Sequence, residues 1–533
     1  MNGRSKVEYY IENGVMENLT FDSMLDILAE KYTYKTALVD MNGRITYGEL
    51  REKAQRLAGV FTTYGITKED NVIVWMNNRI EFFCVIFGLF YIGARPILML
   101  PTHRKKELES ISEFAKPSAI ITYGIELGVD YVKAANEVKK MYKSIKNVFS
   151  YQTDKTDVDL QHLQEVEYGI YTPVQKSEAS DIALFLLSGG TTGIPKLIPK
   201  RHAAYLYNAR CSAQRCGVSE DSVYLAALSI AHDFPLCCPG IFGTMLYGGK
   251  SVLSTTASFD EVGQWIKEEK VTFSAVAPVV AEMWIECMEW EEDVDISSLR
   301  YLIIGASKMD NALANKIENL MHVQIIQGYG LGEGITCFTS LNDPIDIRWN
   351  YQGKPVSEYD EIKIVDDNGN EVLPLHEGEL IERGPYTFEG YYQARELNSK
   401  IFTKDGFFCT GDKALMTSDG NIQILGRVIE QINRAGENII PSEIEEYLKC
   451  HTQILDATVI GLPDKLMGER ICAVLIKKEV ELSKTEICKF LSDKGLANFK
   501  QPDCIYYVDK FPYVNIGKIN KNLLREWIIN KQM

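Results

Sequence analysis

The sequence contains no Cys-x-x-Cys pair, although it has 12 cysteines among its 533 residues. The nearest neighbours are Cys237 beside Cys238, and Cys211 with Cys216, and no tract of histidines accompanies them. These spacings exclude the zinc-finger patterns, and so few cysteines over this length do not make a disulfide scaffold. We therefore expect reduced cysteines in a cytoplasmic protein.

The sequence also lacks a long unbroken apolar run and an excess of positive charge. No apolar signal-peptide core is present in residues 1–20, and the apolar run 82–100 is interrupted by Gly93, Arg95 and Pro96. This run predicts a buried helix over 80–92 followed by a buried strand. The net charge of −16 is unfavourable for binding nucleic acid or an anionic membrane, so any phosphate chemistry must depend on local groups.

The middle of the chain alternates apolar runs with helical stretches. The apolar runs are residues 183–187, 223–230, 271–277, 301–304 and 323–326, and each ends in small or polar residues. This alternation predicts an α/β fold in which helices flank parallel sheets. Such sheets bind ligands at the carboxyl ends of their strands, where these small and polar residues lie.

The pattern changes after about residue 350. Runs 361–365 and 371–373 flank an Asp-Asn-Gly turn, which predicts a hairpin and a small antiparallel unit. Short helices and strands then alternate, at 442–449, 457–461, 471–476, 484–493 and 505–508. We predict a large domain over residues 1–427 and a small α+β domain over residues 428–533.

A loop rich in glycine and hydroxyl groups follows the run 183–187. It reads Ser188, Gly189, Gly190, Thr191, Thr192, Gly193, Ile194, Pro195 and Lys196. Its glycines allow backbone N–H groups to approach a polyphosphate, and Lys196 adds positive charge. A Walker A loop would need Gly-Lys-Ser/Thr at its end, which is absent here. The alternative is a surface hairpin loop without a ligand.

This loop resembles the signature of the adenylate-forming superfamily, which includes acyl-CoA synthetases, luciferases and the adenylation domains of peptide synthetases. Further stretches are similar to the stand-alone aryl-acid–AMP ligases of siderophore assembly, which activate 2,3-dihydroxybenzoate or salicylate. These stretches are 196–199, 231–236 with 239–240, 383–388 with 390–392, and 431–434 with 436–437. The resemblance covers nearly the whole chain and implies a mobile C-terminal domain.

The resemblance implies that ATP and Mg²⁺ are the cofactors. Adenine and ribose contacts are then expected from Gly305, Ala306, Gly328, Tyr329, Asp412 and Arg427. Tyr329 would lie flat against the base, Asp412 would accept hydrogen bonds from the ribose hydroxyls, and Glu333 would offer a hard oxygen ligand to Mg²⁺. Gly332 stands where the family usually carries a hydroxyl residue.

Further roles are implied for the acid and thiol substrates. His232, Asp233, Phe234 and Cys238 are expected to contact the acid. Lys518 resembles the catalytic lysine that bridges the carboxylate and the α-phosphate, and Gly436 resembles the glycine that lines the thiol tunnel. Ile429 occupies the usual hinge position, where the family normally has Asp or Lys.

The implied reaction is activation of a small aromatic carboxylic acid as acyl-AMP, followed by transfer to the phosphopantetheine thiol of an aryl carrier protein. Free coenzyme A is the alternative acceptor, and an amino acid is the alternative substrate. A luciferase-like oxygenase and a catalytically silent nucleotide-binding protein are two further alternatives.

Asp233 predicts the kind of acid. The resembling ligases have Asn at this position, which donates a hydrogen bond to the ring 2-hydroxyl, whereas an ionised carboxylate only accepts. Cys238 suggests that no 3-hydroxyl is recognised. We expect an acid with an amino-type donor near its carboxylate. The alternative is that Asp233 pairs with His232 or a lysine and that the acid is salicylate or 2,3-dihydroxybenzoate.

Overall fold

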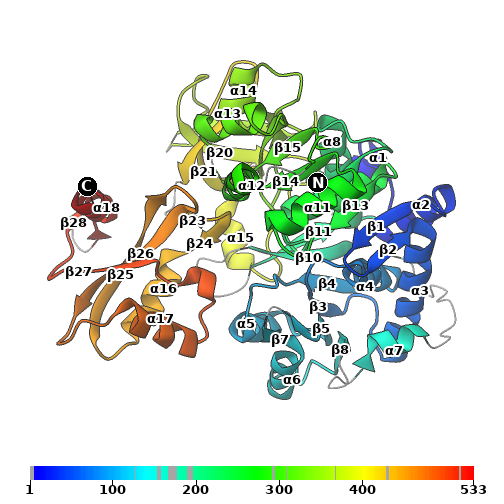
Figure 1. The fold of residues 1–533 in the computed structure, drawn as a ribbon, viewed down its shortest axis with the longest axis horizontal. Coiled ribbons are helices and arrows are strands. Elements are labelled where there is room, and N and C mark those ends of the chain that lie inside the picture. Colours follow the sequence, from blue (N-terminus) through cyan, green and yellow to red (C-terminus); the bar gives the residue numbers. More distant parts are fainter. Residues whose placement is uncertain are drawn as a thin grey trace. The chain divides into compact units, whose positions relative to one another are not determined.

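The computed structural model describes residues 5–126, 128–152, 158–165, 177–188, 196–290, 295–307, 309–366, 368–427, 431–514 and 518–532. They form two compact units, of which the larger consists mostly of residues before 428. The smaller unit consists mostly of residues after 428, with residues 102–110 grouped with it. Figure 1 draws the elements after residue 431 in orange to red. The functional roles predicted for the domains 1–427 and 428–533 stay predictions.

A nine-stranded sheet carries the candidate site. Its order is β18-β17-β16-β15-β14-β12-β13-β1-β2. The strands are β1 (Thr36–Asp40), β2 (Gly43–Thr46), β12 (Val223–Ala226), β13 (Lys250–Leu253), β14 (Phe273–Val276), β15 (Tyr301–Ile304), β16 (Gln324–Gly330), β17 (Thr336–Phe338) and β18 (Lys354–Pro355). The strands from β16 to β1 are parallel, so their carboxyl ends lie along one edge.

Helices connect these strands as the alternating pattern predicts. They are α8 (His202–Arg215), α9 (Asp233–Cys237), α10 (Gly240–Leu246), α11 (Phe259–Glu269), α12 (Pro278–Trp290), α13 (Asn311–Asn319) and α14 (Ile345–Asn350). Helix α12 begins at Pro278, whose fixed φ suits a first helical residue. Helix α13 is capped by Asp310, whose side chain accepts from the backbone N–H of Leu313 at 2.7 Å.

A second sheet has seven strands in the order β11-β10-β4-β3-β5-β8-β9. The strands are β3 (Asn71–Trp75), β4 (Arg95–Leu98), β5 (Ala119–Tyr123), β8 (Asn147–Tyr151), β9 (Val158–Asp159), β10 (Ile182–Ser188) and β11 (Lys196–Arg201). The helices that follow α1 and precede β10 in the chain are α2 (Phe21–Lys31), α3 (Tyr47–Thr63), α4 (Ile80–Tyr91), α5 (Lys105–Ala115), α6 (Tyr131–Met141) and α7 (Leu160–Glu165). Helix α4 is buried almost along its whole length, which accounts for its apolar sequence. Among the described residues, we find no helix with the length and apolar character needed to cross a membrane.

The remaining elements complete both units. The larger has α1 (Lys6–Glu12), α15 (Arg395–Ile401), the hairpin β6 (Ile125–Glu126) and β7 (Val129–Asp130), and the antiparallel sheet β19 (Glu361–Val365), β20 (Gly378–Arg383), β21 (Phe408–Met416) and β22 (Ile422–Arg427). The smaller has β23 (Ile432–Arg434), β24 (Glu437–Ile439), β25 (Ile454–Asp464), β26 (Gly468–Lys477), β27 (Cys504–Tyr507), β28 (Tyr513–Val514) and β29 (Lys518–Ile519). Its helices are α16 (Pro441–Lys449), α17 (Lys484–Asp493), the 3₁₀ turn η1 (Asn498–Lys500) and α18 (Lys521–Gln532).

The predicted fold class is confirmed, with three local corrections. The run 183–187 belongs to β10, in the second sheet, and the glycine-rich loop leads into the antiparallel strand β11. Strand β16 continues through Gly330, because Gly328 to Gly330 pair with β17. Residues 371–373 do not form a strand, since only Glu371 makes a bridge, to Val365.

Candidate active site

The phosphate-loop motif spans the connection between β10 and β11. Ser188 and Lys196 are cross-strand partners, so they hold the two ends of the loop together. The loop residues Gly189, Gly190, Thr191, Thr192 and Gly193 lie outside the described residues. Burial lowers the pKa of Lys196, and the negative charge of Glu333 partly offsets this effect. The motif lysine therefore lies within the electrostatic reach of the predicted metal ligand.

Glu333 is held from two directions by the segment that follows β20. Its Oε1 accepts a hydrogen bond from the hydroxyl of Tyr391 at 2.6 Å, and its backbone carbonyl accepts from the N–H of Phe388 at 2.7 Å. The residue is 8% exposed. A fixed carboxylate beside a lysine that can hold phosphates fits Mg²⁺, which is usually bound by one or two carboxylates plus substrate phosphates.

The glycines on either side of Glu333 allow close packing. A Cβ at position 332 would lie 2.9 Å from Cδ1 of Ile198 on β11. A Cβ at position 334 would overlap Oε1 of Glu382 on β20. Gly332, which stands where the family usually has a hydroxyl residue, therefore lies at a tight contact between the loop that carries Glu333 and the hairpin formed by β10 and β11.

The structure brings two predicted nucleotide-binding residues together. The hydroxyl of Tyr329, near the end of β16, donates to Oδ2 of Asp412 on β21 at 2.6 Å. Asp412 is 3% exposed and is the cross-strand partner of Arg427, whose side chain lies outside the described residues. A fixed carboxylate suits a vicinal diol, because both ribose hydroxyls can donate to its oxygens.

The strand ends beside Tyr329 are packed closely. Gly305 directly follows β15, and a Cβ there would lie 3.0 Å from Cζ of Phe234 and 3.3 Å from the carbonyl oxygen of Gly328. Ala306 adopts a positive φ of 66°, so the chain turns sharply after the strand. Phe234 belongs to the predicted acid site, so this packing joins that site to the predicted adenine site.

The predicted acid-binding residues lie at the start of α9. His232 caps this helix, and its Nδ1 accepts from the N–H of Phe234 at 3.3 Å. Oδ1 of Asp233 accepts from the hydroxyl of Tyr205 at 2.5 Å. Oδ2 of Asp233 lies 3.9 Å from Sγ of Cys238, a weak donor. Among the described residues, the partner of Asp233 is thus neither His232 nor a lysine.

The predicted residues of the smaller unit are described only in part. Gly436 lies between β23 and β24 with a φ of 88°, a left-handed conformation that favours glycine. The backbone of Lys518 begins β29, but its side chain lies outside the described residues, as does Ile429.

Sequence reasoning missed two contacts of the site. Tyr391 was part of a motif that carried the resemblance, and its pairing with Glu333 gives that motif a role. Tyr205 lies on α8, three residues after His202, and nothing in its sequence context indicated a contact with Asp233.

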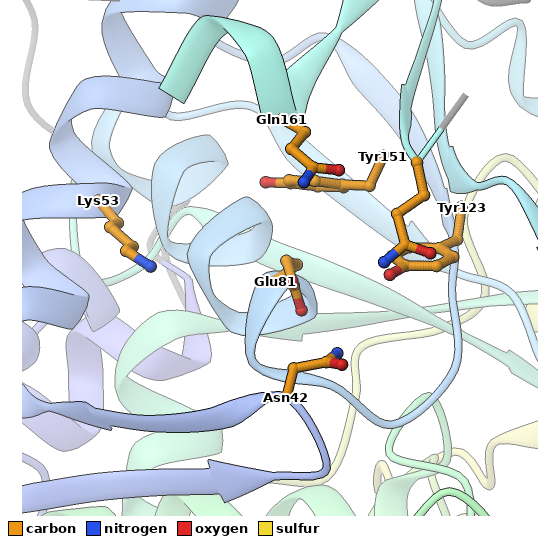
Figure 2. A pocket seen from close by; sticks show the side chains of 7 residues that line it. Asn42, Lys53, Glu81, Tyr123, Tyr151 and Gln161 are labelled. Atoms are coloured by element: carbon orange, nitrogen blue, oxygen red, sulfur yellow. The ribbon is translucent and has the colours of Figure 1, made fainter. Parts of the chain in front are cut away.

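The larger unit also contains a cavity that is separate from the predicted site residues. It measures about 490 Å³ and is lined by Asn42, Lys53, Glu81, Tyr123, Tyr151, Gln152 and Gln161. Figure 2 shows Glu81 extending from α4 between Asn42 and the two tyrosines. None of the predicted site residues lines it.

The profile of the AMP-binding enzyme family matches residues 25–392. The chain belongs to this family. The profile of the AMP-binding enzyme C-terminal domain matches residues 443–518, which lie in the smaller unit.

This AMP-binding enzyme is 39% identical over 526 residues to the 2,3-dihydroxybenzoate-AMP ligase of Bacillus subtilis (strain 168), which covers 98% of this chain and 96% of the relative. It is 34% identical over 520 residues to a Mycobacterium tuberculosis protein named salicyl-AMP ligase / salicyl-S-ArCP synthetase, with coverages of 97% and 92%. The apo structure of MbtA from Mycobacterium smegmatis matches with a TM-score of 0.75 and 34% identity, over 98% of this chain and 97% of that one. These relatives confirm the predicted superfamily and the likeness to the aryl-acid–AMP ligases.

Proposed function

We propose that this enzyme is an aryl-acid–AMP ligase, which activates a small aromatic acid with ATP and transfers it to the phosphopantetheine thiol of an aryl carrier protein. One observation carries the proposal. At the carboxyl edge of the nine-stranded sheet, Gly305 lies between the ring of Phe234 and the carbonyl oxygen of Gly328, so the predicted acid site adjoins the predicted adenine site. The acid and the α-phosphate of ATP are thereby brought into reach of each other.

In the first step, a carboxylate oxygen of the acid attacks the α-phosphorus of ATP. The bond from that phosphorus to the bridging oxygen breaks, and pyrophosphate leaves with its electron pair. The substrate is itself the nucleophile, so the protein contributes positioning and charge neutralisation. Lys196 holds the departing phosphates, Glu333 would hold Mg²⁺, which neutralises phosphate charge when bound, and Lys518 bridges the carboxylate and the α-phosphate.

In the second step, the thiol sulfur attacks the acyl carbon and the bond to AMP breaks. The thiol proton is released, and the products are a thioester and AMP. The smaller unit turns between the two steps, so that Lys518 withdraws and the loop around Gly436 lines the path of the thiol.

The geometry around Asp233 supports an acid with an amino-type donor. Tyr205 already donates to Oδ1, whereas the described residues offer Oδ2 only the weak thiol donor of Cys238. An ortho-hydroxyl has one hydrogen, and its own carboxylate competes for it. An ortho-amino group has two, so it can donate to its own carboxylate and to Oδ2 at the same time.

ATP–pyrophosphate exchange with benzoate, salicylate, 2,3-dihydroxybenzoate, 2-aminobenzoate and a set of amino acids tests this proposal. We expect exchange with the aryl acids, and the highest kcat/KM with 2-aminobenzoate. Exchange only with amino acids, or with none of these acids, contradicts the aryl-acid assignment. A thioester formed with coenzyme A but not with a phosphopantetheinylated carrier protein would contradict the proposed acceptor.

The Asp233→Asn variant separates the acid preference from the activity itself. We expect its kcat/KM for salicylate relative to 2-aminobenzoate to rise about tenfold or more, since one hydrogen bond to a charged group is worth ~1.5–3 kcal/mol. Tyr205→Phe is the matched control, because it removes a donor to Asp233 while retaining the carboxylate. An unchanged ratio in Asp233→Asn rules out recognition of the amino group by Asp233.

A further inference from the structure

A cavity of about 200 Å³ lies in the larger unit. Its lining includes Tyr205 and Tyr391, which contact Asp233 and Glu333, but neither of these two carboxylates lines it. Its charged and aromatic lining includes Lys6, Lys200, Arg201, Tyr205, Glu389 and Tyr391. These residues come from α1, β11, α8 and the segment after β20. The cavity has several times the volume of one water molecule, ~30 Å³.

Two of the three cations in this lining are paired. The guanidinium of Arg201 forms an ion pair with Glu389 at 2.8 Å and donates to the carbonyl oxygen of Ser180 at 2.6 Å. The ammonium of Lys6 donates to the carbonyl oxygen of Thr387 at 3.2 Å. Glu389, the single carboxylate among the described residues of the lining, is therefore already used by Arg201.

Lys200 is the third cation, and it is 3% exposed. Its ammonium lies over the ring of Tyr205, 4.8 Å from the ring centroid, and it forms no hydrogen bond or ion pair with the residues that the structure describes. The carboxyl of Glu382 interacts with Lys200 through space without forming an ion pair with it, and its Oε2 accepts from the hydroxyl of Thr387 at 2.5 Å. Burial of an ammonium without a hydrogen-bond acceptor is costly, and Glu382 offers charge at a distance but no hydrogen bond to it.

We propose that this cavity is a binding site for a small inorganic anion, between chloride and phosphate in size, with Lys200 as its counter-ion. The anion supplies a hydrogen-bond acceptor and a negative charge in direct contact with the ammonium. The size of the cavity excludes a nucleotide and a carrier protein, so the site is distinct from those of the proposed reaction.

The site is connected to the acid site through Tyr205. The ring of this tyrosine faces the ammonium of Lys200, and its hydroxyl donates to Asp233. An anion on Lys200 withdraws the ammonium from the ring and alters the hydrogen bond that Asp233 receives. We therefore expect anion binding to change the KM for the acid at least twofold and to leave the KM for ATP unchanged.

Bromide locates the site directly. We expect crystals of the full chain soaked in sodium bromide to show an anomalous peak next to Lys200, and crystals of Lys200→Met to lack it. Lys196→Met is the matched control, because it removes a cation of the phosphate loop and keeps the cavity. Absence of the peak in the unmodified protein overturns the proposal and leaves a cavity filled with water alone.

Thermal unfolding gives a second readout that does not depend on crystals or activity. At equal ionic strength, chloride at ten times its Kd is expected to raise Tm by roughly 2 °C relative to gluconate, an anion larger than the proposed ligands. Lys200→Arg should keep this shift and Lys200→Met should lose it. If Lys200→Met does not fold, the loss or retention of the shift in Lys200→Gln decides. If chloride raises Tm equally in the unmodified protein and in the variant without a charge at position 200, the proposed site is wrong.

Discussion

The hydroxyl of Tyr391 lies 2.6 Å from Oε1 of Glu333 and donates a hydrogen bond to it. The ammonium of Lys196 lies over the same tyrosine ring, 5.2 Å from its centroid. A single side chain therefore contacts both the predicted metal ligand and the predicted phosphate ligand. Tyr391 is 8% exposed, so its position is fixed by packing.

The first prediction follows from this contact. Tyr391→Phe leaves the ring in place but frees one oxygen of Glu333 to rotate away from the metal position. Loss of a hydrogen-bond partner of a metal ligand typically lowers metal affinity ~10–100-fold. We therefore expect the Mg²⁺ concentration for half-maximal pyrophosphate exchange to rise by that factor. Tyr392→Phe is the control, because its ring packs on Phe185 instead. Equal Mg²⁺ dependence in both variants would show that Glu333 does not need Tyr391.

The second prediction concerns the pair Tyr329 and Asp412. Asp412→Asn should raise the KM for ATP by ~10–100-fold, because hydrogen bonds from ribose hydroxyls to a charged carboxylate are lost. Tyr329→Phe should have a smaller effect, since the carboxylate stays. Asp419→Asn, on the exposed turn after β21, controls for the loss of one charge. A KM for ATP that is unchanged in Asp412→Asn would remove Asp412 from the ribose site.

The third prediction separates the two half-reactions. Lys518→Ala should suppress formation of acyl-AMP by ~10²-fold or more, because it removes charge neutralisation made mainly in the transition state. Thioester formation from supplied acyl-AMP should survive. Lys489→Ala, an exposed lysine of the same unit, is the control. Equal loss of both half-reactions in single-turnover assays would contradict the proposed domain rotation.

The fourth prediction tests the thiol path. Gly436→Leu should block thioester formation and leave pyrophosphate exchange nearly intact. The φ of 88° makes any side chain here strained. Gly436→Ala has the same strain without the bulk, so a difference between the two variants reports obstruction. Loss of exchange with normal thioester formation would contradict the assignment.

The fifth prediction concerns stability and pH. Burial raises the pKa of the Asp360 carboxyl from its ordinary value of 3.8 to about 8, although the hydroxyl of Tyr386 donates to it. The folded protein therefore holds this proton more tightly than the unfolded chain does. The resulting stability is present below about pH 4 and is lost as the pH rises towards 8.

The urea concentration at which half of the protein is unfolded should fall between pH 5 and pH 8. This fall should be smaller in Asp360→Asn, because the amide cannot ionise. Asp366→Asn is the contrasting control, because backbone hydrogen bonding to Asn370 lowers the pKa of Asp366 and its effect lies at acid pH. If the urea midpoint of Asp360→Asn falls as much as that of the unmodified protein, another group is responsible for the loss of stability in this pH range.

The sequence was sufficient for those features that depend on local patterns. The helix over 80–92 and the strand over 301–304 could be predicted from apolar periodicity and from the polar residues that end each run. The strand ends that carry Gly305 and Tyr329 followed from the same pattern, because parallel strands place their carboxyl ends along one edge.

The contacts that fix the site were beyond local patterns. Tyr205 and Asp233 are separated by 28 residues, and Tyr391 and Glu333 by 58. Each pair meets only because different elements pack together. The continuation of β16 through Gly330 was missed for a related reason, since its glycines suggest a turn but find partners in β17.

The packing of Glu382 against Gly334 has an evolutionary consequence. Because a side chain at position 334 would overlap Oε1 of Glu382, these two positions cannot vary independently. A substitution at 334 forces the carboxylate of Glu382 to move and still approaches Cα of Thr387 at 3.2 Å, so a shorter residue at 382 relieves part of the clash and the order of mutations matters. Mutant libraries that diversify the loop around Glu333 should therefore vary positions 334 and 382 together.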